Sequence, residues 1–179
     1  RYFLDFDLPE TIGRVRAFYG NFLVMVRAYT YIRELGAEGL KLATQMAVLN
    51  ANYLRCKLGK TYEIPFDRMC MHECVATDGH LKKYGVANID VAKGLIDRGF
   101  HPPTVSFPIN VHGALMVEPT ETESREEIDR FIAALEDISE VAATDPDALH
   151  NAPRMTYICR PDEAAAARQL ILTADMIED

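Results

Sequence analysis

The sequence has no long apolar run, no excess of positive charge and no signal-like start. Its most apolar segment, residues 18–32, contains Arg27 and is flanked by Arg16 and Arg33, so we expect no membrane-spanning helix. The net charge of −8 and the pI near 5.1 disfavour nucleic acids and anionic membranes as partners. The first residues, RYFLDFDLPETIGR, lack the pattern of a signal peptide and do not begin with methionine. We therefore expect the chain to be part of a longer protein.

Cysteine is scarce, with four residues in 179, which is too few for a disulfide scaffold. The run MCMHEC suggests a metal site at first. On an extended strand, however, Cys70 and Cys74 would lie about 13 Å apart, too far to share one zinc ion. Cys70 and Cys74 are therefore interpreted as small apolar residues on a core strand, and we predict no metal site. Reduced thiols indicate the cytoplasm.

Helical spacing predicts a long, two-part helical segment in the first third of the chain. Asn21 is a good N-cap, and the run that follows it is apolar on nearly every face. Such a helix is either buried or packed against something outside this chain. The pattern restarts after Gly36 and stops at Gly59. We assign residues 1–59 to a leading segment with long connecting helices, and residues 60–179 to a small C-terminal α/β domain.

The remainder alternates strand and helix patterns. Asn88 and Ser124 are the expected N-caps of two helices, with Glu127 completing a capping box, and Pro161 is expected near the first position of a terminal helix. Strands are expected at YEIPF, MCMHECVAT, TVSFPI and ALMVE. This order predicts an α/β (α+β) fold, in which a small, mainly antiparallel sheet carries helices on one face.

Four stretches together resemble one enzyme family. They are GRVRAFYGNFLVMVRAYTYIRELGAEGL, AVLNANYL, GFHPPTVSFP and ALMVEPTETESREEIDRFIAAL, which span most of residues 12–143. They are similar to the C-terminal part of the glycine cleavage system P-protein, most like the second subunit of two-subunit forms. The resemblance implies the small C-terminal domain of a type I fold that depends on pyridoxal 5'-phosphate (PLP), preceded by a long connecting helix.

The resemblance also implies an activity and its partners. Glycine would lose CO2 with PLP as the electron sink, and the aminomethyl group would pass to the lipoyl arm of the H-protein. The family's cofactor lysine follows a histidine, but no His-Lys pair occurs here. We therefore expect the Schiff-base lysine upstream of Arg1, in the large domain, and expect this chain alone to be inactive. The other P-protein subunit is a further expected partner.

Two groups of residues are candidates for the active site. In the type I fold, the loop that corresponds to HPPT reaches the active site, and two consecutive prolines would hold the His101 imidazole and the Thr104 hydroxyl in place. His101 is then a candidate proton donor. A rigid loop that packs His101 against the upstream domain explains the motif equally well.

The second group precedes the first helix. By analogy with the fold, Arg14, Arg16 and Asn21 would approach the cofactor phosphate, which suits a helix N-terminus and two cations. The alternative is that Asn21 only caps the helix while both arginines face water.

Two further readings concern the acidic segment and the class of protein. EPTETE is interpreted as a helix entry and solvated face rather than a site.

The strand ALMVE lacks the carboxylate-binding arginine of many aminotransferases, which suits an enzyme that must expel the carboxylate. A stand-alone interaction domain, or an amino-acid-binding regulatory domain without catalysis, remains the alternative.

Overall fold

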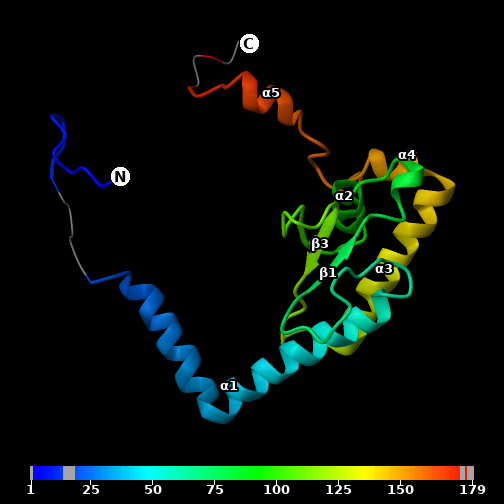
Figure 1. Cartoon of the computed structure of the whole chain (residues 1–179), viewed down its shortest axis with the longest axis horizontal. Helices are drawn as coiled ribbons and strands as arrows, with labels where there is room; N and C mark the ends of the chain where they lie inside the picture. The colour runs from blue at the N-terminus through cyan, green and yellow to red at the C-terminus, as the bar shows by residue number, and fades with distance from the viewer. Residues whose placement is uncertain (1, 14–18, 174–175, 177–179) are drawn as a thin grey trace. The chain divides into compact units, whose positions relative to one another are not determined.

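The computed structural model describes residues 2–13, 19–173 and 176. The chain divides into two compact units, Arg1–Lys41 and Leu42–Asp179. None of the helices in the described part is long and apolar enough to cross a membrane. The elements labelled in Figure 1 are α1 (Phe22–Leu58), β1 (Cys74–Thr77), α2 (Asn88–Asp97), β2 (Thr104–Val105), β3 (Ala114–Val117), α3 (Arg125–Thr144), α4 (Pro146–His150) and α5 (Glu163–Arg168), with a short 3-10 turn at Lys82–Tyr84.

Helix α1 has the two parts that the sequence predicts. Asn21 is its N-cap, because its side-chain oxygen accepts a hydrogen bond from the Val24 amide at 3.3 Å. Gly36 interrupts the helix with φ 61° and ψ −172°, a conformation that glycine adopts without steric cost. The helix ends at Leu58, immediately before Gly59.

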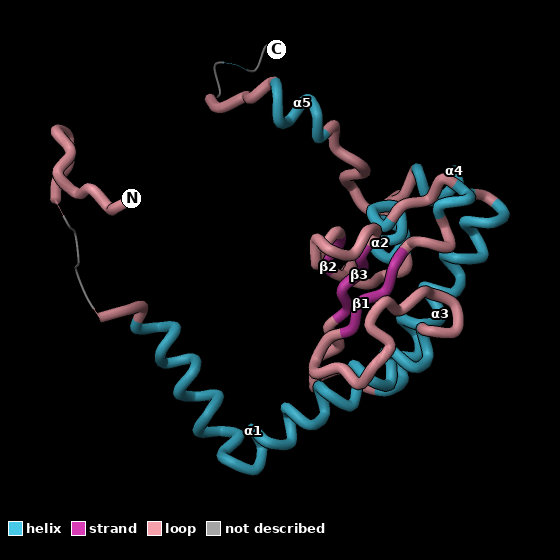
Figure 2. Tube along the Cα trace, viewed as in Figure 1, coloured by secondary structure: helices cyan, strands magenta, loops and turns pink. Residues whose placement is uncertain are grey.

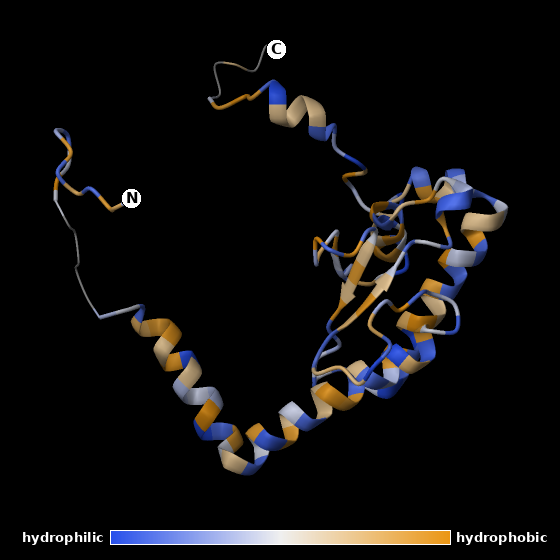
Figure 3. Cartoon of the chain, in the orientation of Figure 1, coloured by the Kyte–Doolittle hydropathy of each residue, from blue (hydrophilic) through white to orange (hydrophobic). Residues whose placement is uncertain are grey.

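The first part of α1 is mostly apolar, with a few hydrophilic residues between the apolar ones (Figure 3). Phe22 and Leu23 are each 70% exposed, and Tyr29 is 66% exposed. Within its own compact unit this run is therefore not buried. Both alternatives, burial against the rest of the chain and cover by a partner outside it, stay predictions.

The sheet is small and entirely antiparallel, with the strand order β1-β3-β2 (Figure 2). Cys74 pairs with Val117 at one end of the β1–β3 ladder, and Thr104 pairs with Met116 in the β2–β3 ladder. Side chains alternate between the faces of a strand. One face, which includes Ala76 and Leu115, packs into the core together with the helices.

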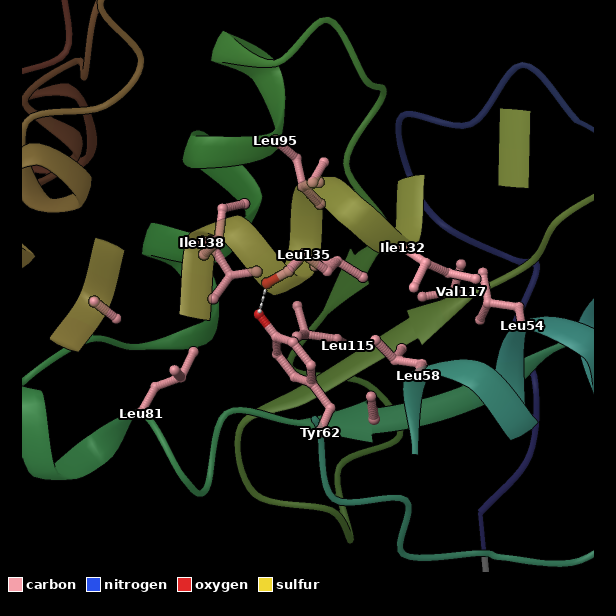
Figure 4. Packing of buried hydrophobic residues seen from close by; sticks show 14 of the residues in the cluster. Leu54, Leu58, Tyr62, Leu81, Leu95, Leu115, Val117, Ile132, Leu135 and Ile138 are labelled. Carbon is pink, nitrogen blue, oxygen red and sulfur yellow. Dashed lines mark hydrogen bonds between the residues drawn. The ribbon is translucent and has the colours of Figure 1, made fainter. Parts of the chain in front are cut away.

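The core joins the second part of α1, the sheet, α2 and α3 (Figure 4). Tyr62 is fully buried, and its hydroxyl donates a hydrogen bond to the Leu135 carbonyl oxygen at 2.9 Å. The expected apolar stripe of α3 supplies its side of the core through Ile128, Ile132, Leu135 and Ile138. The α/β fold with helices on one face of an antiparallel sheet is therefore confirmed.

The strands expected before β1 are wrong in length or absent. YEIPF contributes one isolated bridge, Glu63 to Thr77, because Pro65 cannot donate to a ladder. In MCMHECVAT only Cys74–Thr77 forms a strand. The backbone of Cys70 is bonded elsewhere: its amide donates to Asn52 Oδ1 at 3.0 Å, and its carbonyl accepts from Asn52 Nδ2 at 2.7 Å. The Asn52 side chain on α1 thus makes the backbone hydrogen bonds that a neighbouring strand would otherwise make.

Strand β2 is also shorter than TVSFPI, since it ends at Val105 and Ser106 adopts φ 59°. The left-handed conformation of Ser106 turns the chain out of the extended direction. The chain stays attached to the start of β3 at this point, because the Ser106 amide donates to the Ala114 carbonyl at 2.9 Å.

Two expected helix starts are also corrected. Ala87, not Asn88, is the N-cap of α2. The Asn88 side chain instead donates to the Ala114 carbonyl at 3.0 Å and to the Ser106 hydroxyl at 3.1 Å, which joins α2 to the sheet. Helix α5 begins at Glu163 with Asp162 as its N-cap, so Pro161 lies before the helix.

The capping box expected at α3 forms on one side. Ser124 Oγ accepts the Glu127 amide at 3.1 Å, as the sequence predicts. The Glu127 carboxylate accepts a hydrogen bond from Arg130 at 2.6 Å, one turn along the helix. Ser124 therefore fixes the start of α3. Glu127, in the first turn of this helix, lies near the loop that precedes β2.

Candidate active-site cavity

The His-Pro-Pro-Thr segment is the connection between α2 and β2, and it is held at both ends. Before it, the Phe100 amide donates to the Leu95 carbonyl at 3.0 Å, and the Phe100 ring packs edge-to-face on Phe131 of α3 with centroids 5.4 Å apart. After it, Thr104 enters the sheet opposite Met116. Both prolines are half-buried, whereas His101 and Thr104 are exposed. The loop is therefore anchored at both ends, with the His101 and Thr104 side chains exposed.

This segment forms one wall of a cavity of about 490 Å³ in the second compact unit. The other walls come from the end of β3, the loop after it, the first turns of α3 and Leu54 of α1. The lining residues are Leu54, Gly99, Phe100, His101, Pro102, Pro103, Thr104, Met116, Val117, Glu118, Pro119, Thr120, Glu123, Glu127, Ile128 and Phe131. Two of the stretches that carry the family resemblance, GFHPPTVSFP and ALMVEPTETE, thus meet in one place.

The cavity has an apolar floor and an acidic edge. Leu54, Ile128 and Phe131 are apolar, and Glu118 and Glu123 are exposed carboxylates. No lysine or arginine is among the described lining residues. In the described part of the chain, the His101 ring has no hydrogen-bond or ion-pair partner, so its nitrogens are available to a bound molecule. The arrangement can offer an imidazole and hydroxyls to a small polar molecule.

The sequence did not predict that the acidic segment, residues 118–123, forms a wall of the cavity. Glu118, Thr120 and Glu123 are exposed, as a solvated face requires, but they also lie opposite the HPPT loop. No local pattern could reveal this, because Thr104 and Met116 are brought together by sheet pairing. The pairing of β2 with β3 decides which residues share the cavity.

The cavity lies entirely within a segment that matches a known family. Residues 43–154 match the family described as "Glycine dehydrogenase, C-terminal domain". This chain belongs to that family. The resemblance to the C-terminal part of the P-protein is thereby confirmed, including its likeness to a second subunit, as the relatives below show.

Three relatives carry the name "Probable glycine dehydrogenase (decarboxylating) subunit 2". The chain is 52% identical to the one from Listeria monocytogenes serotype 4a (strain HCC23) over 171 residues, which is 96% of this chain and 35% of the relative. It is 50% identical to that of Staphylococcus epidermidis over 179 residues, which is 100% and 36%. It is 51% identical to that of Bacillus velezensis over 168 residues, which is 94% and 34%. The chain spans about a third of the length of these curated relatives.

The second group of candidate residues, Arg14, Arg16 and Asn21, is not among the described residues that line this cavity. Arg14 and Arg16 lie outside the described residues. Asn21 belongs to the first compact unit, and its side chain accepts the Val24 amide, as a capping residue does. A contact of these three residues with a cofactor phosphate in the glycine dehydrogenase family domain therefore stays a prediction.

The cysteines behave as thiols rather than as a disulfide or zinc framework. All four are free. Burial raises the pKa of Cys74 to about 12 and also raises the pKa of Cys70. The run MCMHEC does place His72 and Glu73 beside Glu118, with one potential ligand atom from each within 4.8 Å of the others. Groups of this kind are common on protein surfaces without a metal ion, and we assign none here.

Proposed function

We propose that this chain is the C-terminal portion of a PLP-dependent glycine decarboxylase of the cytoplasm. The enzyme would release CO2 from glycine and pass the aminomethyl group to the lipoyl arm of the H-protein, together with a partner subunit. One observation carries the proposal: the family-matched residues 43–154 include the whole cavity that HPPT and the acidic segment form. The names of the relatives favour this enzyme over a stand-alone binding or interaction domain.

The cavity by itself does not fit PLP. A phosphate dianion needs cations or a set of backbone amides, and a covalently held cofactor needs a lysine. The described lining residues supply neither a lysine nor an arginine, and Glu118 and Glu123 would repel the phosphate. We therefore propose that PLP and its lysine belong to the part of the protein that the longer relatives have in addition.

The residues of this chain would contribute the substrate side of the site. The His101 imidazole would serve as a proton donor or hydrogen-bond partner for the bound molecule. Thr104 offers a hydroxyl as a hydrogen-bond donor or acceptor. Phe100 and Phe131 form an apolar part of the wall. Among the described residues that line the cavity, no lysine or arginine could hold a carboxylate that the reaction must expel.

The test uses the full-length protein with its partner subunit, the H-protein and PLP. We expect the wild type to release CO2 from glycine, and His101→Ala to lower turnover by roughly 100-fold or more, because general acid–base groups contribute ~10²–10⁴-fold. His112→Ala is the matched control, since His112 is an exposed loop histidine outside the cavity. Absence of decarboxylation in the wild type contradicts the proposed function. Unchanged turnover in His101→Ala contradicts the role of the histidine.

A further inference from the structure

Asn50, in the AVLNANYL stretch of α1, joins that helix to the acidic wall of the cavity. It is a buried polar residue, 7% exposed. Its side-chain amide donates to the Thr120 carbonyl at 2.9 Å and to the Glu123 carbonyl at 3.2 Å. We propose that Asn50 is a positioning residue that holds residues 118–123 at the correct distance from the HPPT loop. This inference rests on the proposed function of the cavity.

The loop that Asn50 holds carries the acidic wall of the cavity. It connects β3 to α3, and Pro119 has no amide proton to donate. Within the loop, the Glu123 amide donates to the Thr120 carbonyl at a long 3.3 Å. The two bonds from Asn50 attach the backbone of this loop to helix α1. Both accepting residues line the cavity.

The site for Asn50 is itself rigid. Its neighbours on α1, Ala51 and Leu54, are 0% and 1% exposed and belong to the close-packed part of the unit. A donor fixed on a buried helix transmits its position to the loop, and a displacement of about 1 Å in an active site can cost ~100-fold in rate. Loss of the two donors would also leave the Glu123 carbonyl without this partner and the Thr120 carbonyl with only the long bond from the Glu123 amide, which lets the loop move away.

Asn52 provides an internal control, because it makes a similar attachment to a different segment. Two residues along the same helix, its side chain exchanges two hydrogen bonds with the Cys70 backbone, at 2.7 and 3.0 Å. Cys70 does not line the cavity. Replacing either asparagine by leucine therefore removes two interactions between α1 and a loop, but only the Asn50 variant frees the cavity wall.

The experiment compares Asn50→Leu with Asn52→Leu in the full-length protein with its partner subunit, H-protein and PLP. Amide hydrogen exchange should speed up in a peptide covering 116–124 for Asn50→Leu, and in one covering 66–73 for Asn52→Leu, without crossing over. We expect kcat for glycine decarboxylation to fall roughly 10- to 100-fold in Asn50→Leu, with a smaller change in KM, and less than threefold in Asn52→Leu.

The turnover of the two variants is compared per folded molecule. If both variants lose turnover equally, or if neither does while the wild type is active, the assignment of Asn50 is overturned and the proposed function stands. An inactive wild type overturns the proposed function instead, and hydrogen exchange then still decides whether Asn50 holds the loop. Should Asn50→Leu fail to fold, Asn50→Ala removes the same donors without bulk. If that also fails to fold, Asn50 is a folding residue and the proposal is wrong.

Discussion

Gly113 and Asp78 are so close that no side chain fits at position 113. A Cβ atom on Gly113 would overlap the Asp78 carboxylate, and the Asp78 amide donates to the Gly113 carbonyl at 3.0 Å. Asp78 is 2% exposed and its carboxylate accepts the Asn88 amide at 2.8 Å. The pair therefore fastens the end of β1, the start of α2 and the entry to β3 at one point.

Gly113→Ala should destabilise the chain strongly. The residue has φ 68°, so alanine adds backbone strain to the overlap with Asp78, and we expect a loss of roughly 3–4 kcal/mol in the free energy of unfolding. Urea unfolding measures it. Gly99→Ala is the control, because Gly99 has φ 80° with no atom near its Cβ position, and strain alone should cost roughly 1–2 kcal/mol. Equal losses would show that the overlap relaxes freely.

The two prolines of the HPPT loop should matter for rate more than for stability. In the complete enzyme, Pro102→Ala with Pro103→Ala frees the backbone that places His101, so turnover should fall while the melting temperature changes little. Steady-state kinetics and thermal unfolding are measured on the same preparations. Pro161→Ala, in an exposed segment outside the cavity, is the control. Full turnover together with a clear loss of thermal stability would assign the prolines to packing.

The four thiols should react with a disulfide reagent in an order set by their burial. Cys56 and Cys159 are exposed, whereas Cys74 is 4% exposed with its pKa raised to about 12 by burial. At pH 8 we expect the two exposed thiols to be labelled first and Cys74 only on unfolding. Mass spectrometry of quenched samples identifies the labelled residues. Early labelling of Cys74 in the folded chain would be inconsistent with the core position of β1.

His80 should make stability depend on pH below neutrality. Burial, and then the nearby Lys83, lower its pKa in the folded chain from the ordinary 6.5, while Asp78 acts in the opposite direction. The unfolded chain therefore binds a proton at His80 more readily. The free energy of unfolding should decrease as the pH falls below about 6.5 and level off below the folded pKa. Measured from pH 8 to 5, His80→Gln should remove this part of the slope; an identical slope would contradict it.

No lysine of this chain should take up PLP specifically. The six lysines include none that lines the cavity, and none follows a histidine. When the chain is mixed with a low concentration of PLP and reduced with borohydride, we expect scattered labelling well below one equivalent at any lysine. Peptide mapping locates the adducts. Stoichiometric labelling of a single lysine would mean that this chain does hold the cofactor.

Local patterns predicted the parts of the fold that depend on local interactions. The caps at Asn21 and Ser124, the interruption at Gly36 and the apolar stripe of α3 were all readable, because a capping bond or a helical repeat involves residues a few positions apart. Family membership was equally accessible, since stretches such as HPPT and MVEPTETE occur intact in the sequence.

Only the tertiary structure decided which of these stretches lie together. Asn88 is by type an ordinary N-cap, yet it bonds across 26 positions to Ala114, and Asn50 bonds across 70 positions to Thr120. Such bonds form because a buried amide must find a partner, and the nearest partner is set by the packing of helices on the sheet rather than by neighbours in the chain. The cavity wall opposite HPPT is a product of that packing.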